Sequence, residues 1–128
     1  MSETDLTTLI RSMSPRLLPG VFVFVSTNAL HEGVRPIMIF REAEGTTLIV
    51  PQEQAEAAGL PAVFPSRMIT LEIASSLEAV GFLAAITAAL ARAGIAVNPV
   101  SAFHHDHLFV PEGRADEAMA ILQAMASG

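Results

Sequence analysis

Hydrophobic positions recur with two different periods along this chain, and the two periods predict its helices and strands. Apolar residues at helical spacing near the N-terminus predict a short helix over residues 2–13, with Ser2 and Asp5 positioned to cap its start. Three β-rich runs then predict a small meander of strands, at 20–27, 35–42 and 46–51. The stretch "PQEQAEAAG" at 51–59 opens with proline and closes with glycine, which is typical of a short helix.

The second half of the chain carries the clearer pattern. Ile69, Leu71 and Ile73 alternate with polar residues and predict a strand over 68–74. "SSLEAVGFLAAITAALARAG" then predicts the best helix of the chain, with Ser76 as its N-cap and a glycine at its end. Its body is apolar nearly all round, so we expect a second helix layer or a partner subunit to cover it. Two strands and a closing helix follow: "IAVNPVSAF", "HLFVP" and "EGRADEAMAILQAMA".

A unit of sequence is used twice. Leu48 and Val50 of the first half match Leu108 and Val110 of the second at a constant offset. The second half reads strand, helix, strand, strand, helix, and the first half resembles it loosely. We therefore predict an α+β fold of two ferredoxin-like βαββα units, with antiparallel sheets and helices on one face. The proline-containing stretch "LPAVFPSR" at 60–67 suggests the boundary, which gives domains at 1–64 and 65–128.

Composition narrows the functional classes. The chain of 128 residues is 52% hydrophobic, which leaves little polar surface to cover a core and favours a homodimer. No apolar run approaches the roughly 20 residues of a bilayer helix, and the acidic N-terminus does not resemble a signal peptide, so we expect a cytoplasmic protein that does not bind membranes.

The residue types that are missing exclude several chemistries. There is no cysteine, lysine, tyrosine or tryptophan, so disulfides, thiolate catalysis, Schiff bases and a phosphate-binding lysine are absent. The net charge is -6 and the seven arginines stand singly, which argues against nucleic-acid binding.

The stretch "FHHDHLFVPEG" at 103–113 holds three of the four histidines around one aspartate. In an extended chain His105 and His107 share one face, whereas zinc requires three or four ligands. A metal site would therefore need His31, Glu112 or a second subunit. A solvated hairpin turn is the simpler alternative. A hydrolytic site would need a serine, but no nucleophile-elbow motif surrounds any serine of the chain.

The second half, over about residues 66–126, resembles an ACT domain, the small ferredoxin-like module that binds amino acids in metabolic regulators. Ser75, Ser76 and Gly81 in "SSLEAVGFLAAI" match the polar residue and glycine of the turn after its first strand, although the usual "DxPG" wording is absent. "DHLFVPEGRADEAMAIL" is similar to tandem ACT proteins that include the cytosolic arginine sensors of the TOR pathway. The first half resembles the partner domain that precedes this module in bacterial proteins, through "LLPGVFVFVST" and "EGTTLIVP".

The resemblance implies a sensor without catalysis that works through oligomer interfaces. The turn before the long helix offers backbone N–H groups to the carboxylate of an amino acid, and Asp106 offers a charge to an ammonium or guanidinium group. Glu78 either steadies the helix cap or contacts the cationic end of the ligand. We expect no metal, cofactor or catalytic residue, and the candidate ligand-binding residues are Ser75, Ser76, Glu78, Val80, Gly81, His105 and Asp106. A structural or interaction module that binds no ligand is the alternative.

Overall fold

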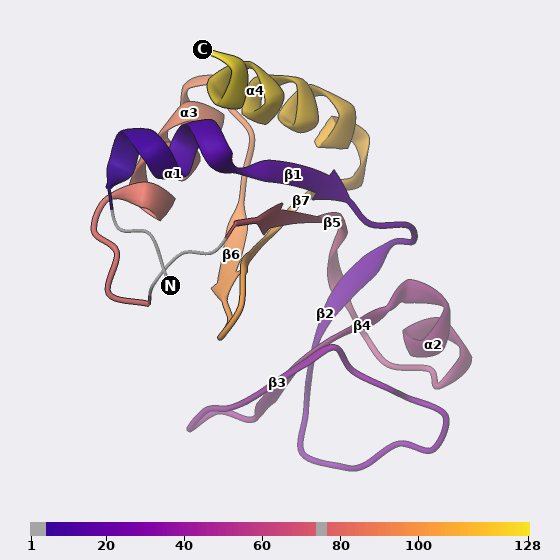
Figure 1. The fold of residues 1–128 in the computed structure, drawn as a ribbon. Coiled ribbons are helices and arrows are strands. Elements are labelled where there is room, and N and C mark those ends of the chain that lie inside the picture. Colours follow the sequence, from indigo (N-terminus) through magenta and orange to yellow (C-terminus); the bar gives the residue numbers. More distant parts are fainter. Residues whose placement is uncertain (1–4, 74–76) are drawn as a thin grey trace. The chain divides into compact units, whose positions relative to one another are not determined.

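The chain folds into two compact units that interleave in the sequence. The computed structural model describes residues 5–73 and 77–128 (Figure 1). Unit 1 comprises Met1–Pro19 and Arg67–Gly128, and unit 2 comprises Gly20–Ser66. One break between the units, after Ser66, falls inside the stretch that the sequence suggested as a boundary, but the other, after Pro19, was not expected.

Unit 2 is an antiparallel sheet with one helix. Its strand order is β3-β4-β2-β5, and its elements are β2 (Phe22–Thr27), β3 (Met38–Arg41), β4 (Thr46–Pro51), α2 (Gln52–Ala57) and the first residues of β5 (Val63–Glu72). Every second residue of β2 and β4 faces a small core that α2 closes with Ala55, so the core consists of Val23, Val25, Leu48, Val50 and Ala55.

Unit 1 has a sheet of four strands with three helices. The sheet order is β1-β5-β7-β6, formed by β1 (Ser14–Leu17), the remainder of β5, β6 (Asn98–Ser101) and β7 (Asp106–Pro111). β5 thus pairs with β2 in unit 2 through its first residues and lies between β1 and β7 in unit 1 through the remainder. The fourth position of the unit 1 sheet is taken by β1 from the N-terminal segment, which is why unit 2 lies between two parts of unit 1 in the sequence.

Three helices cover one face of the unit 1 sheet (Figure 1). They are α1 (Leu6–Ser12), α3 (Phe82–Arg92) and α4 (Ala115–Ser127), the last preceded by the short 3-10 helix η1 (Glu112–Arg114). Leu9, Ile86 and Leu122, one from each helix, are fully buried together with Leu71 and Leu108 of the sheet. α1 and α4 flank α3 in this layer, but Ala84, Ala88 and Ala91 of α3 are exposed. The second helix layer expected from the sequence is not found among the described residues, and a partner subunit over α3 stays a prediction.

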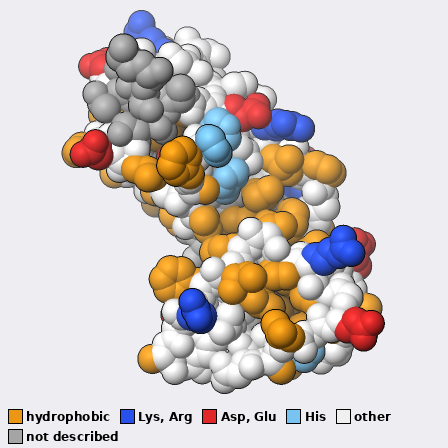
Figure 2. Space-filling view, turned by 60° about the horizontal axis from the view of Figure 1, so that its bottom comes forward, with side chains coloured by type: hydrophobic (Ala, Val, Ile, Leu, Met, Phe, Trp, Pro, Cys, Tyr) orange, Lys and Arg blue, Asp and Glu red, His pale blue; other side chains and the backbone are white. Residues whose placement is uncertain are grey.

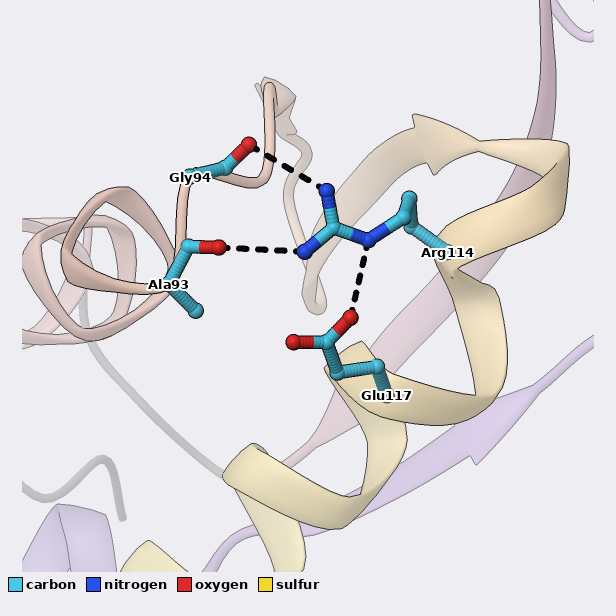
Figure 3. Close-up of polar contacts among 4 residues, drawn as sticks. All are labelled: Ala93, Gly94, Arg114 and Glu117. Atoms are coloured by element: carbon cyan, nitrogen blue, oxygen red, sulfur yellow. Dashed lines mark hydrogen bonds and ion pairs between the residues drawn. The ribbon is translucent and has the colours of Figure 1, made fainter.

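An arginine joins the end of α3 to the start of α4 (Figure 3). The Arg114 guanidinium donates hydrogen bonds to the carbonyl oxygens of Ala93, at 3.0 Å, and Gly94, at 3.4 Å, and to Glu117 at 2.8 Å. Carbonyl groups at a helix C-terminus lack intrahelical partners and carry partial negative charge, so a cation is favoured there. The contact fixes α3 at the end opposite to the pocket described below.

The fold class is confirmed, and several local predictions need correction. The stretch "LPAVFPSR", which the sequence suggested as a boundary, contains the first residues of β5, Val63 to Arg67. The long helix begins at Phe82 and not near Glu78, because Gly81 has a left-handed backbone (φ 92°) that ends the preceding turn. β1 was missed, since "SPRL" is short and contains a proline. Unit 2 has no helix between its first two strands, where residues 28–37 form a loop.

No helix within the described part of the chain is long and apolar enough to cross a membrane.

Candidate ligand site

Unit 1 contains a pocket between the segment that leads into α3 and the β6–β7 hairpin. Its volume is about 170 Å³, which suits a metabolite smaller than a drug-sized ligand. The wall on the α3 side is apolar, and the wall on the hairpin side carries most of the polar groups. The lining residues come from two segments: Leu77, Ala79, Phe82 and Leu83 from the first, and residues 101–106 from the second.

Asp106 brings a carboxylate to the hairpin side of the pocket. It is the first residue of β7 and pairs with Ser101, the last residue of β6. The Ser101 hydroxyl donates a hydrogen bond of 2.5 Å to Asp106 Oδ1. Leu108 and Val110, two and four residues further along β7, face the core, so alternation places Asp106 on the helix side of the sheet. Within the described residues no cationic side chain forms an ion pair with Asp106, which leaves its charge available to a ligand.

The N-terminus of α3 faces the same pocket through its first two residues, Phe82 and Leu83. Among the described residues no side chain caps this helix start, where Gly81 is the N-cap residue and its carbonyl accepts the first intrahelical bond, from Ala85 N–H. The first N–H groups of an α-helix have no intrahelical acceptor and carry partial positive charge. A carboxylate placed here would accept hydrogen bonds from these N–H groups.

His105 also lines the pocket, and its Nδ1 atom is buried without a hydrogen-bond partner among the described residues. A buried polar nitrogen without a partner costs about 1–3 kcal/mol. A ligand that hydrogen-bonds this nitrogen would recover that free energy. The ring lies next to two others, with centroid distances of 6.5 Å to His104 and 6.4 Å to His107.

His107 lies outside the pocket. Its Nδ1 is 2.9 Å from the hydroxyl oxygen of Thr70, a buried residue of the neighbouring strand β5. Burial lowers the pKa of His107 below its usual value of 6.5, His105 lowers it further, and Asp106 acts in the opposite direction. His107 therefore favours the neutral form and serves as a hydrogen-bond partner of the sheet.

The structure brings only part of the predicted site together. His105 and Asp106 line the pocket, whereas Gly81 lies between the lining residues Ala79 and Phe82 and does not line the pocket itself. Glu78 is exposed and does not line it, and Val80 is 85% exposed.

Two readings at the start of α3 were wrong. Glu78 precedes the helix and cannot occupy its first turn, and the N-cap is Gly81 instead of Ser76. Ser75 and Ser76 themselves lie outside the described residues.

The sequence did not single out several residues that line the pocket. Ser101 is one of them, and its hydroxyl donates a hydrogen bond to Asp106. Phe103 is another lining residue; its side chain is 78% exposed, and its ring centroid is 5.0 Å from that of His104. Figure 2 shows histidine and hydrophobic side chains side by side on this face of the molecule. Ser101 is the residue of β6 that pairs with Asp106. This pairing could not be predicted, because the sequence does not show where β6 ends.

No three metal-ligating side chains come close enough to hold a metal ion anywhere in the two described stretches. His31, which a metal site would have needed as a further ligand, lines a different pocket that belongs to unit 2. The histidine stretch is better described as a hairpin connection that supplies one wall of a pocket.

Comparison with known proteins decides the family. A model of the ACT domain matches residues 1–67, and a second ACT domain model matches residues 63–124. The chain belongs to the ACT domain family. A crystal structure of a Vibrio cholerae protein of unknown function, described as a possible transport protein, is 40% identical to this ACT protein. The match covers 94% of this chain and 95% of that one, with a TM-score of 0.86.

More distant structures share the fold alone. A protein from Agrobacterium tumefaciens is 16% identical with a TM-score of 0.75, and the match covers 89% of both chains. The ligand-free regulatory subunit of aspartate kinase from Thermus thermophilus is 11% identical with a TM-score of 0.67, covering 91% of this chain and 97% of that one. No functionally curated protein matches the sequence significantly.

Proposed function

We propose that this ACT protein is a non-catalytic regulatory protein that binds a free amino acid in the unit 1 pocket. The observation that carries the proposal is the convergence on one pocket of about 170 Å³ of two features: a helix N-terminus that no described side chain caps, and the Asp106 carboxylate, which has no ion-pair partner among the described residues. An amino acid has two opposite charges on one small body, and the pocket offers a partner for each.

The charges of the pocket give the ligand one orientation. Its carboxylate lies at the N–H groups that begin α3, where the helix dipole favours an anion. Its ammonium, or a guanidinium on a longer side chain, lies at Asp106, and a charge-assisted hydrogen bond forms there. Phe82 and Leu83 contact the aliphatic part. His105 Nδ1 is left to bond a polar atom of the ligand.

A regulatory role follows from the family, since ACT domains are regulatory modules and two of them make up this chain. Ligand binding would tie α3 to the β6–β7 hairpin, because the two segments line the same pocket. A homodimer and a cytoplasmic location remain predictions from the sequence.

A thermal unfolding screen of the full chain against the twenty amino acids, one at a time, tests the proposal. A ligand that binds only the folded state raises the midpoint, by an amount equivalent to about 2.7 kcal/mol at a concentration one hundred times its Kd. We expect one amino acid, or a small chemically related group, to stabilise the wild-type protein. Asp106→Ala should lose that stabilisation while it still folds.

Asp116→Asn provides the matched control, because Asp116 is an exposed residue of α4 in the same unit and lines no described pocket. It should retain the full stabilisation by the same amino acid. If no amino acid raises the midpoint of the wild-type protein, the chain is a structural or interaction module and the proposal is wrong.

A further inference from the structure

The β3–β4 hairpin of unit 2 and the β6–β7 hairpin of unit 1 are two copies of one element. Both first strands have four residues, and both second strands have six. Arg41 pairs with Thr46 in the first hairpin as Ser101 pairs with Asp106 in the second. The matching ends of the two hairpins therefore place Thr46 where unit 1 has Asp106, and Arg41 where unit 1 has Ser101.

Unit 2 has its own pocket at this corresponding place, with a volume of about 210 Å³. Thr46 and Leu48 line it from β4, and their strand partners Thr27 and Ile39 line it from the two neighbouring strands. The loop between β2 and β3 forms the opposite wall, where unit 1 has the segment that leads into α3. The same topological position thus holds a pocket in both units.

The charge of the unit 2 pocket differs from that of the unit 1 pocket. No aspartate or glutamate is among its described lining residues, and its one ionisable residue is His31, whose Nε2 is 3.2 Å from the Thr27 hydroxyl oxygen. Arg41 lies on the same strand face as Ile39, since the two are two residues apart. The ion pairs found among the described residues do not include Arg41.

The acidic residue closest in sequence to Arg41 is already engaged. Glu42 accepts a hydrogen bond from the hydroxyl of Thr47, whose side chain points to the sheet face opposite to that of Thr46. The polar side chains among the described lining residues carry hydroxyl, amide and imidazole groups. Each of these groups can donate a hydrogen bond to an anion.

We propose that the pocket of unit 2 binds a small aliphatic carboxylate, with His31 of the loop and Thr46 of the sheet as polar partners and the neighbouring Ile39 and Leu48 as apolar contacts. The carboxylate lies toward His31, Thr46 and the Arg41 rim, and the aliphatic body contacts the apolar wall. A free amino acid is disfavoured, because no carboxylate among the described lining residues is there to receive its ammonium. The two pockets thus bind different classes of ligand, and the proposal does not depend on the amino-acid site of unit 1.

The test is a titration of the full chain with 3-methylbutanoate, followed by two-dimensional methyl NMR. We expect chemical-shift changes at Leu30, Val34, Ile39 and Leu48, with a Kd at or below about 1 mM. The uncharged probe 3-methylbutanamide, which has the same shape, should bind at least about tenfold more weakly.

Two substitutions locate the charge. Thr46→Asp restores the residue type of unit 1 and should weaken 3-methylbutanoate binding by at least about tenfold through repulsion. Arg41→Gln should also weaken 3-methylbutanoate binding, because it removes a positive charge from the rim of the pocket. Arg41 is exposed, so this variant should fold and the proposal can be tested even if Thr46→Asp unfolds the sheet. Thr7→Asp and Arg92→Gln make the same charge changes on exposed positions of α1 and α3 and should leave the affinity unchanged.

Three results would overturn the proposal: no shift changes up to about 10 mM 3-methylbutanoate, equal binding of the amide, or shift changes confined to unit 1. Asp106→Ala should leave 3-methylbutanoate binding intact. Failure of this proposal is thereby distinguished from failure of the amino-acid site.

Discussion

Substitution of Gly81 by alanine tests whether α3 begins where the structure places it. Gly81 is the N-cap of α3 with φ 92°, a left-handed backbone that an L-residue enters at a cost of about 1–2 kcal/mol. Space is not the obstacle, because a Cβ atom here would lie 3.7 Å from Leu6 Cδ2, an ordinary contact. Alanine also lowers the conformational entropy of the unfolded chain, which raises the free energy of unfolding by about 0.4–1 kcal/mol. The expected net loss is about 1 kcal/mol, equivalent to roughly 4 °C in Tm.

Urea unfolding followed by circular dichroism measures this loss, and two further variants serve as internal comparisons. Gly81→Asn should lose less than Gly81→Ala, because asparagine tolerates the left-handed region better. Gly113→Ala should be neutral or slightly stabilising, because Gly113 has no positive φ and no atom within 4 Å of an added Cβ. A Gly81→Ala protein as stable as wild type would refute the assignment of this helix start and, with it, the position of the N–H groups proposed to bind the ligand.

Four other predictions concern the core, pH, a hydrogen bond within the sheet and assembly. Leu122→Ala should lower the free energy of unfolding by about 2–5 kcal/mol because Leu122 is fully buried, whereas Leu30→Ala should have little effect because Leu30 is exposed; urea unfolding compares them. Burial lowers the pKa of His107, so the unfolded chain binds its proton more readily, and stability should fall as the pH drops below about 6.5 and level off below the folded-state pKa. A free energy of unfolding that does not change across this pH range would contradict the lowered pKa. Thr70→Val should lower the free energy of unfolding by about 1 kcal/mol, because it removes the hydrogen-bond partner of His107 Nδ1. Sedimentation at micromolar concentration should show a dimer, and a monomer would remove that prediction.

The sequence predicted the strands of both hairpins and the last helix because their hydrophobic periods are strong and their ends carry turn residues. It even showed the repeat, since Leu48 and Leu108 occupy the same position in the two hairpins. β1 and the double use of β5 could not be predicted, because they depend on which strands pair, and pairing between distant segments leaves no local signal. Only the fold reveals that the N-terminal segment completes the unit 1 sheet.

The sequence singled out some of the residues that line the unit 1 pocket. Asp106 and His105 stood out because three of the four histidines lie around one aspartate in this stretch. Ser101 did not, because its role comes from the register of the hairpin. Ser76 looked like a helix cap by type, but the conformational freedom of Gly81 decided where the helix starts, and the apolar wall at Phe82 and Leu83 moved with it.

The most direct test of the central claim is a calorimetric titration of the amino acid that most stabilises the protein, on wild type and on Asp106→Asn side by side. The substitution keeps the shape and the acceptor oxygen of the side chain and removes its charge. If Asp106 receives the cationic group of the ligand, loss of that charge should cost about 2–5 kcal/mol, a loss in affinity of at least about 30-fold. Equal affinity of the two proteins would contradict the account, because the ligand would then bind without the carboxylate on which the unit 1 site is built.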